Sequence, residues 1–209
     1  MPTFLRLVAG LGNPGRGYAS TRHNVGFWFA DRLASALGMK FAASAKFFGD
    51  VAKGGEMRIV KPATYMNESG RSLGALARFC DLSPQEILIA HDELDLPPGE
   101  VRLKRGGGLA GHNGLRDIHS ALGSADFWRL RIGIGHPRGS ELPQPEVFDY
   151  VLKAPRPEER TAIDSAIARA LAAWPDIARG HLERAMQALH TRAPAGAAAE
   201  AESRPKDPP

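Results

Sequence analysis

Polar side chains that could do chemistry gather in four loops of this sequence, each next to an apolar segment with the pattern of a strand. Two loops span residues 10–15 and 18–24, and a third spans residues 61–67. A fourth region joins residues 91–95 to a glycine-rich stretch at 106–114. Folds commonly place catalytic and binding groups in such loops. The candidates are a histidine, a carboxylate and three amides: His23, Asp92, Asn13, Asn67 and Asn113.

Among these residues, His23 is the candidate for moving a proton. An imidazole with an unperturbed pKa near 6.5 can act as a base at neutral pH. A single histidine is nevertheless more often structural, and Asp92 could merely cap a turn. Asn67 precedes a helical pattern and could likewise be an N-cap. Taken one at a time, the loops leave the chemistry open.

The first loop, GLGNPG, also matches the GxGxxG pattern, so a nucleotide-dependent oxidoreductase is one alternative. That fingerprint requires a helix directly after the glycines, with its N-terminus against the pyrophosphate. Here Pro14 lacks an amide hydrogen, and the helical pattern begins about eight residues after Gly15. The glycines therefore favour a turn that exposes Asn13.

A metal site is a second alternative, because His91, Asp92, Glu93 and His112 are all possible zinc ligands. The sequence has no HExxH motif and no paired CxxC motif to support it. A serine hydrolase is disfavoured because no GxSxG elbow is present. Cys80 falls in an apolar helical pattern and is predicted to lie in the core. We expect no metal and no cofactor.

Composition limits the class of protein. The 209 residues suggest one domain, and 43% hydrophobic with 24% charged residues is typical of a globular chain. A single cysteine excludes an intramolecular disulfide and fits a reducing compartment. The apolar runs are shorter than a membrane span requires, and the first ten residues lack a secretory pattern. We therefore expect a cytoplasmic protein that does not enter a membrane.

Charge is distributed unevenly around the candidate loops. The net charge is +4, residues 81–100 hold six acidic and no basic side chains, and residues 102–138 hold seven basic ones against Asp117 and Asp126. A solvated surface is one interpretation of this pattern. The other is a face that contacts phosphates beside an acidic pocket.

Alternating strands and helices would position these loops. Apolar patterns predict strands at 4–10, 48–53, 57–61, 87–90, 101–104 and 130–134, with a hairpin around Gly54-Gly55. Helical spacing predicts helices at 25–37, 67–79 and 115–122, and two helices within 157–190 that are separated at Pro175. These elements predict an α/β fold, a single three-layer domain with a twisted mixed β-sheet flanked by helices. We assign the domain to residues 1–191 and a disordered Ala/Pro-rich tail to residues 192–209.

Together, five segments of the chain resemble the bacterial peptidyl-tRNA hydrolase family. They are LVAGLGNPGRGYASTRHNVGF, KPATYMNESG, HDELDLPPG, GGGLAGHNGL and RLRIGIGHP, in the family's order between about residues 5 and 189. The resemblance implies hydrolysis of the ester between a peptide and the 3′ end of tRNA, which returns free tRNA to translation. It also implies a metal-free, cofactor-free monomer.

The resemblance assigns roles to the loop residues. His23 matches the catalytic base, and Asp92 matches the acid that orients it. Asn13 matches the residue that distinguishes an N-blocked aminoacyl group from a free one. Asn67 and Asn113 match the amides that hold the substrate's 3′ end and the reacting groups. Side-chain amides can stabilise an oxyanion, and Asn113 is the first candidate for that role.

Further positions carry over to substrate binding. Tyr18 and Tyr65 match aromatic positions of the tRNA site, and Met66 would line an apolar wall. Basic positions that would contact phosphates fall at or near Arg102, Lys104 and Arg131. The sequence departs from many members at Leu109-Ala110, where they have His-Gly.

The main competing class is a noncatalytic RNA-binding relative that uses this fold to bind a partner. Such a protein could lose the pattern formed by His23 and Asp92. This chain retains both residues, together with the three asparagines, which favours an enzyme.

Overall fold

The computed structural model describes residues 4–137 and 146–190, and over these ranges the chain forms one seven-stranded sheet with helices on both faces. The strands are β1 (Leu7–Gly10), β2 (Phe41–Ser44), β3 (Gly49–Gly54), β4 (Met57–Pro62), β5 (Ile87–Glu93), β6 (Val101–Arg105) and β7 (Trp128–Gly133). The helices are α1 (Val25–Ala36), α2 (Ser69–Phe79), α3 (Asn113–Leu122), α4 (Val147–Val151), α5 (Pro157–Ala172), α6 (Trp174–Ala178) and α7 (Leu182–His190).

The sheet is mixed, with strand order β2-β3-β4-β1-β5-β7-β6. The parallel strands β4, β1, β5 and β7 form its centre. Antiparallel strands complete both edges: β2 and β3 beside β4, and β6 beside β7. The β3–β4 pair is the hairpin expected at Gly54-Gly55, and Gly55 adopts the positive φ of +57° that such a turn favours.

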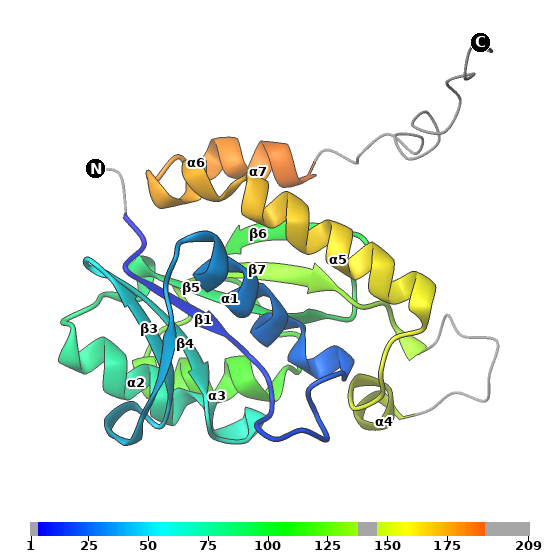
Figure 1. Cartoon of the computed structure of the whole chain (residues 1–209), viewed down its shortest axis with the longest axis horizontal. Coiled ribbons are helices and arrows are strands. Elements are labelled where there is room, and N and C mark those ends of the chain that lie inside the picture. Colours follow the sequence, from blue (N-terminus) through cyan, green and yellow to red (C-terminus); the bar gives the residue numbers. More distant parts are fainter. Residues whose placement is uncertain (1–3, 138–145, 191–209) are drawn as a thin grey trace, which may run out of the picture.

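Helices cover both faces of the sheet (Figure 1). Alternate side chains of the buried strands enter two separate cores. On one face, α1, α5, α6 and α7 pack against Val8 and Leu88. On the other face, α2 and α3 pack against Leu7 and Ile89. Helices on both faces explain why the central strands are apolar on both sides. The expected three-layer α/β fold with a mixed sheet is confirmed.

Several local predictions need correction. The helix expected at 67–79 begins at Ser69 after a 3-10 turn at Met66–Glu68, so Asn67 is not its N-cap. Residues 157–190 form three helices, because Pro175 lies in the first turn of α6, where a missing N–H costs no hydrogen bond. Cys80 is only half-buried at the edge of the α2–α3 core. Strand β2 and helix α4 were not predicted, and the tail 192–209 lies outside the described residues.

Close contact between α1 and the ends of β1 and β5 depends on glycine. A Cβ on Gly26 would overlap the Ala90 carbonyl oxygen and the Leu11 backbone, and one on Gly10 would overlap the Gly26 carbonyl oxygen. The absence of side chains here brings the start of α1, and the turn before it, onto the carboxyl ends of these strands.

We therefore expect Gly26→Ala to lower the free energy of unfolding by at least about 1–3 kcal/mol, because backbone atoms cannot move aside cheaply. It should also reduce turnover by displacing the turn before α1. Gly17→Ala is the matched control, since no atom lies within 4 Å of a Cβ placed there. Equal unfolding midpoints in urea for the two variants would contradict the role given to Gly26.

Candidate active site

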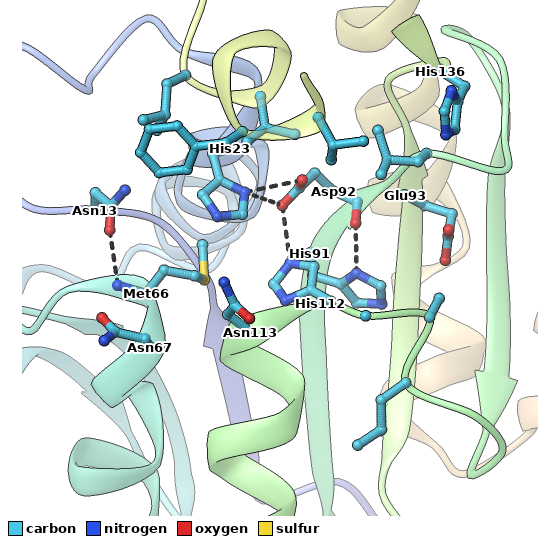
Figure 2. A pocket seen from close by; sticks show the side chains of 18 of the residues that line it. Asn13, His23, Met66, Asn67, His91, Asp92, Glu93, His112, Asn113 and His136 are labelled. Atoms are coloured by element: carbon cyan, nitrogen blue, oxygen red, sulfur yellow. Dashed lines mark hydrogen bonds and ion pairs between the residues drawn. The ribbon is translucent and has the colours of Figure 1, made fainter. Parts of the chain in front are cut away.

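A pocket of about 870 Å³ opens at the carboxyl ends of β1 and β5 (Figure 2). Ligands of open α/β sheets characteristically bind at this edge. The loops after β1 and β4, the end of β5, the start of α3 and helix α4 all contribute to its lining. Eight residues selected from the sequence line it: Asn13, Tyr18, His23, Tyr65, Met66, Asn67, Asp92 and Asn113.

His23 and Asp92 are in direct contact in this pocket. Nδ1 of His23 lies 3.0 Å from each carboxylate oxygen of Asp92. An ionised carboxylate only accepts hydrogen bonds, so Nδ1 of the neutral ring carries the proton and Nε2 keeps its lone pair. In Figure 2, the second ring nitrogen of His23 faces the space bordered by Asn13, Met66 and Asn113. That geometry is suited to a general base.

The 3-10 turn Arg22–Asn24 holds His23 from both sides. Arg22 is buried, pairs with Glu159 of α5 at 2.6 Å and stacks 4.1 Å from the centre of the Tyr150 ring. Asn24 exchanges two hydrogen bonds of 2.9 Å with the backbone of Asn13. The turn is therefore fixed to α4, α5 and the loop after β1.

The pKa shifts agree with this arrangement. Burial alone would lower the pKa of His23, but the Asp92 carboxylate outweighs it and raises that pKa above the ordinary value. Burial alone would raise the pKa of Asp92, but His23 and His112 favour the ionised form and hold its pKa well below the usual range. Burial lowers the pKa of His91 to about 3, so this ring is neutral at pH 7. Its Nδ1 lies 2.7 Å from the Asp92 backbone oxygen.

Three side-chain amides line the same pocket as His23. The side-chain oxygen of Asn13 accepts the Met66 N–H at 2.8 Å, which leaves the NH2 group of Asn13 directed away from Met66 (Figure 2). Asn67 lies in the turn before α2, and Asn113 is the first residue of α3. Both are exposed residues of the pocket lining. Three segments of the chain therefore each place one side-chain amide in the lining of this pocket.

The remaining walls are aromatic and apolar. Tyr18 and Tyr65 pack edge to face with ring centres 6.4 Å apart, and Tyr65 is exposed. Helix α4 adds an apolar wall on the side of His23, with Phe148 largely exposed. The wall comprises Val147, Phe148, Val151 and the adjoining Leu152.

The three predicted phosphate-contacting residues lie outside the pocket lining, on one face of β6 and β7. Arg102 pairs in register with Arg131, so their side chains share that face with Lys104. Arg102 and Lys104 are exposed. Arg131 is 19% exposed and its Nε lies 2.7 Å from a Glu93 carboxylate oxygen, so much of its charge is already neutralised. Arg102 and Lys104 are the better placed of the three to contact a phosphate.

The possible metal ligands that lie together in the structure differ from the set considered from the sequence. His23, Asp92 and His112 each offer a ligand atom, and these atoms lie within 4.8 Å of one another. However, Nδ1 of His112 accepts the Leu115 N–H at 3.3 Å, so the ring proton sits on Nε2, where a metal would need a lone pair. The group fits a hydrogen-bonded carboxylate better than a cation site.

Three features in and beside the pocket were not predicted from the sequence. His112 contacts Asp92, yet the sequence offered it only as a possible metal ligand; its position directly before Asn113 was the available signal. Asn24 stands beside His23 and reads as an ordinary helix-start residue. The α4 wall had no signal, because five residues are too few for a periodic pattern.

A histidine held by a buried carboxylate, with side-chain amides in the same pocket of an α/β scaffold, is an arrangement typical of hydrolases. The described pocket lining contains no serine or cysteine that could act as a nucleophile instead.

Comparison with known proteins gives the family. The sequence model of the protein family described as peptidyl-tRNA hydrolase matches residues 7–196 of this chain. The peptidyl-tRNA hydrolase of Bordetella petrii is 56% identical over 195 residues, which cover 91% of this chain and 92% of the relative. That of Azoarcus sp. is 54% identical, covering 90% and 85%. The crystal structure of peptidyl-tRNA hydrolase from Acinetobacter baumannii matches with a TM-score of 0.86 and 44% identity, covering 93% of this chain and 98% of that one. The chain therefore belongs to the peptidyl-tRNA hydrolase family.

Family membership confirms the resemblance seen in the motifs and the expectation of a hydrolase. It removes the oxidoreductase alternative. No helix follows the glycines directly, as the sequence suggested, but residues 11–14 are irregular and not a turn, and Asn13 is a buried residue of the pocket lining and not an exposed one. Among the described residues, no helix is long and apolar enough to span a membrane.

Proposed function

We propose that this chain hydrolyses the ester between a peptide, or an N-blocked aminoacyl group, and the 3′ end of tRNA, with His23 as general base and Asp92 as the group that orients it. The observation that carries the proposal is the contact of His23 Nδ1 with buried Asp92, which leaves Nε2 free to face the pocket. Membership in the family supports the substrate.

The reaction needs only groups that line the pocket. Nε2 of His23 takes a proton from water as the water oxygen attacks the ester carbonyl, and Asp92 stabilises the imidazolium that forms. The carbonyl oxygen becomes an oxyanion, to which Asn113, or second Asn67, donates an amide N–H. Breakdown of the intermediate releases the tRNA 3′ oxygen, which takes the proton back from His23. The products are the free carboxylic acid and the tRNA.

The Asn13 contact refines how a blocked amine is selected. The Asn13 side chain offers an oxygen acceptor and an NH2 donor, and its oxygen already accepts the Met66 N–H. We assign the remaining Asn13 NH2 group to the substrate, where it donates to the carbonyl oxygen of the peptide or acetyl group. A free α-ammonium group has no acceptor to offer, so it would lose hydration without gaining a bond.

The pH dependence of turnover follows from the raised pKa of His23. A general base must be unprotonated, so kcat/KM should rise with pH and level off only above the unperturbed histidine pKa of about 6.5. A pH profile between 5 and 9 with N-acetylaminoacyl-tRNA measures this limb. A midpoint below 6.5 would contradict the Asp92 effect on His23.

Contacts with tRNA phosphates should make binding salt-dependent, and we assign them first to Arg102 and Lys104. The double variant Arg102→Ala with Lys104→Ala should raise KM. The slope of log KM against log salt concentration should fall by about one to two, because each lost phosphate contact releases about one counterion fewer. Its kcat should change little because neither side chain lines the pocket. Lys53→Ala on β3, across the sheet, is the control. An unchanged salt slope in the double variant would remove this face from the tRNA site.

The proposal also includes a metal-independent monomer that works in the cytoplasm. Its catalytic domain is residues 1–191, and residues 192–209 are dispensable for turnover. Metal independence is supported by the hydrogen bonds that Asp92 makes with two imidazoles, His23 and His112. Hydrolysis of N-acetylaminoacyl-tRNA in the presence of EDTA, with free aminoacyl-tRNA as the control, tests the activity. Binding of tRNA without hydrolysis would favour the noncatalytic RNA-binding alternative.

A further inference from the structure

We propose that His112 is a positioning residue of this site: it donates a second hydrogen bond to Asp92 and thereby limits how strongly Asp92 holds the proton of His23. The inference rests on the proposed function of His23 as general base. It assigns to His112 a role beyond helix capping.

One carboxylate oxygen serves both histidines. Oδ1 of Asp92 lies 3.0 Å from Nδ1 of His23 and 3.1 Å from Nε2 of His112. The Asp92 side chain is 3% exposed and that of His112 is 8% exposed, so water competes little for these bonds. In Figure 2, the two rings approach the carboxylate from different sides. Asp92 is therefore held in place by two N–H donors.

The start of α3 fixes the tautomer of His112. The Leu115 N–H donates to Nδ1 of His112, which is the N-cap of α3. A nitrogen that accepts this bond has no proton, so the proton of the neutral ring is on Nε2 and points at Asp92. His91 packs edge-on against His112 with ring centres 5.0 Å apart and keeps it in this orientation.

The second hydrogen bond has a predictable sign. A donor on Asp92 Oδ1 spreads the carboxylate's negative charge and weakens its attraction for the His23 imidazolium. Removing this donor raises the pKa of His23, so the base is protonated over a wider pH range. It also frees the carboxylate to rotate, and the His23 ring loses its fixed direction toward the reacting space.

Most other charged groups near His23 are neutral or paired elsewhere, whereas His112 contacts the Asp92 carboxylate directly. On β5, Glu93 bonds Arg131, and His91 stays neutral. The α4 residues in the pocket lining are apolar. Charged residues of the turn and of α1 are engaged in other ion pairs, which are Arg22–Glu159, Lys61–Asp31 and Arg32–Asp164. The pocket lining also contains four further titratable side chains: Tyr18, Tyr65, Asp95 and His136.

Two substitutions separate the capping role of His112 from its role toward Asp92. The amide oxygen of Asn can replace Nδ1 as the helix cap but does not reach Asp92. The longer Gln places an N–H donor near the position of Nε2 but caps poorly. His112→Asn therefore keeps the cap and loses the carboxylate contact, and His112→Gln does the reverse. His119→Gln, an exposed position on α3, controls for changes to this helix.

The decisive measurement is an NMR titration of the His23 ring in the full chain without substrate, combined with pH profiles of kcat for N-acetylaminoacyl-tRNA. We expect His112→Asn to fold normally, to raise the pKa of His23 and to lower kcat about tenfold or more at neutral pH. His112→Gln should keep the wild-type His23 titration and most of kcat, despite a lower Tm. KM should change little in both variants.

Identical His23 titrations in the Asn and Gln variants would overturn the proposal, as would a kcat that tracks Tm alone. The titration needs no substrate, so it tests the role of His112 separately from the activity. If the wild-type chain fails to hydrolyse N-acetylaminoacyl-tRNA, the proposed function fails, whereas the effect of His112 on His23 is still measured.

Discussion

Replacing His23 by alanine should lower kcat for N-acetylaminoacyl-tRNA by about 10²–10⁴-fold, the usual contribution of a positioned general base. The imidazole of His23 is the group whose second nitrogen faces the pocket. The other imidazole on Asp92, that of His112, has both ring nitrogens engaged, by Asp92 and by the Leu115 N–H. Binding of tRNA should persist, with Kd changed by less than about twofold, because phosphate contacts supply most of the affinity. Single-turnover kinetics and a tRNA-binding titration measure the two quantities separately.

His119→Ala is the matched control for His23→Ala, because it removes an exposed histidine of α3 outside the pocket lining. Turnover of that variant should equal the wild type. If His23→Ala kept wild-type kcat, the base would have to be another residue. If both kcat and tRNA binding collapsed together, His23 would be a binding or folding residue rather than a catalytic one.

Asp92→Asn should have an effect of similar size, about 10²–10⁴-fold on kcat, although it changes few atoms. An amide can donate its own N–H to Nδ1 of His23, which stabilises the tautomer with the proton on Nε2 and leaves no lone pair for water. The variant also loses the charge that raises the pKa of His23. The pH profile of its residual activity should therefore shift toward lower pH.

Asp95→Asn tests whether any acid in the pocket would serve. Asp95 also lines the pocket but is exposed, and we assign it no catalytic role. Its removal should leave the pH profile unchanged. Equal losses from Asp92→Asn and Asp95→Asn would show that overall negative charge, and not orientation of His23, supports turnover.

The same pair of residues links stability to pH. The raised pKa of His23 contributes stability that is complete below the unfolded-state value of about 6.5 and is lost as pH rises through the folded-state pKa. The lowered pKa of Asp92 contributes stability that is present above its unfolded-state pKa and is lost as pH falls through the folded one. The difference in unfolding free energy between wild type and Asp92→Asn should therefore be larger at pH 6 than at pH 9. Urea unfolding at both values measures it.

Much of the fold was predictable because its signals are local. The apolar run before Gly10, the hairpin at Gly54-Gly55 and the stripe of α5 each lie within a few residues, and each formed the expected element. Predictions failed where a short segment depends on its neighbours. Strand β2 is half-buried and exists by pairing with β3, and α4 packs against the turn that holds His23.

The sequence by itself determined the family, the three-layer fold and the set of polar side chains. The reason is that each motif is a short contiguous segment, which can be recognised from its residue types and their order alone. Only the tertiary structure decided which of these groups meet. Asp92 is 69 residues from His23 and 20 from His112 in the sequence, yet both imidazoles bond its carboxylate. Arg131 carries a positive charge that could contact a phosphate, but in the structure its guanidinium is paired with the Glu93 carboxylate. These contacts depend on strand register and helix packing, which bring distant residues within hydrogen-bond distance and which no local pattern encodes.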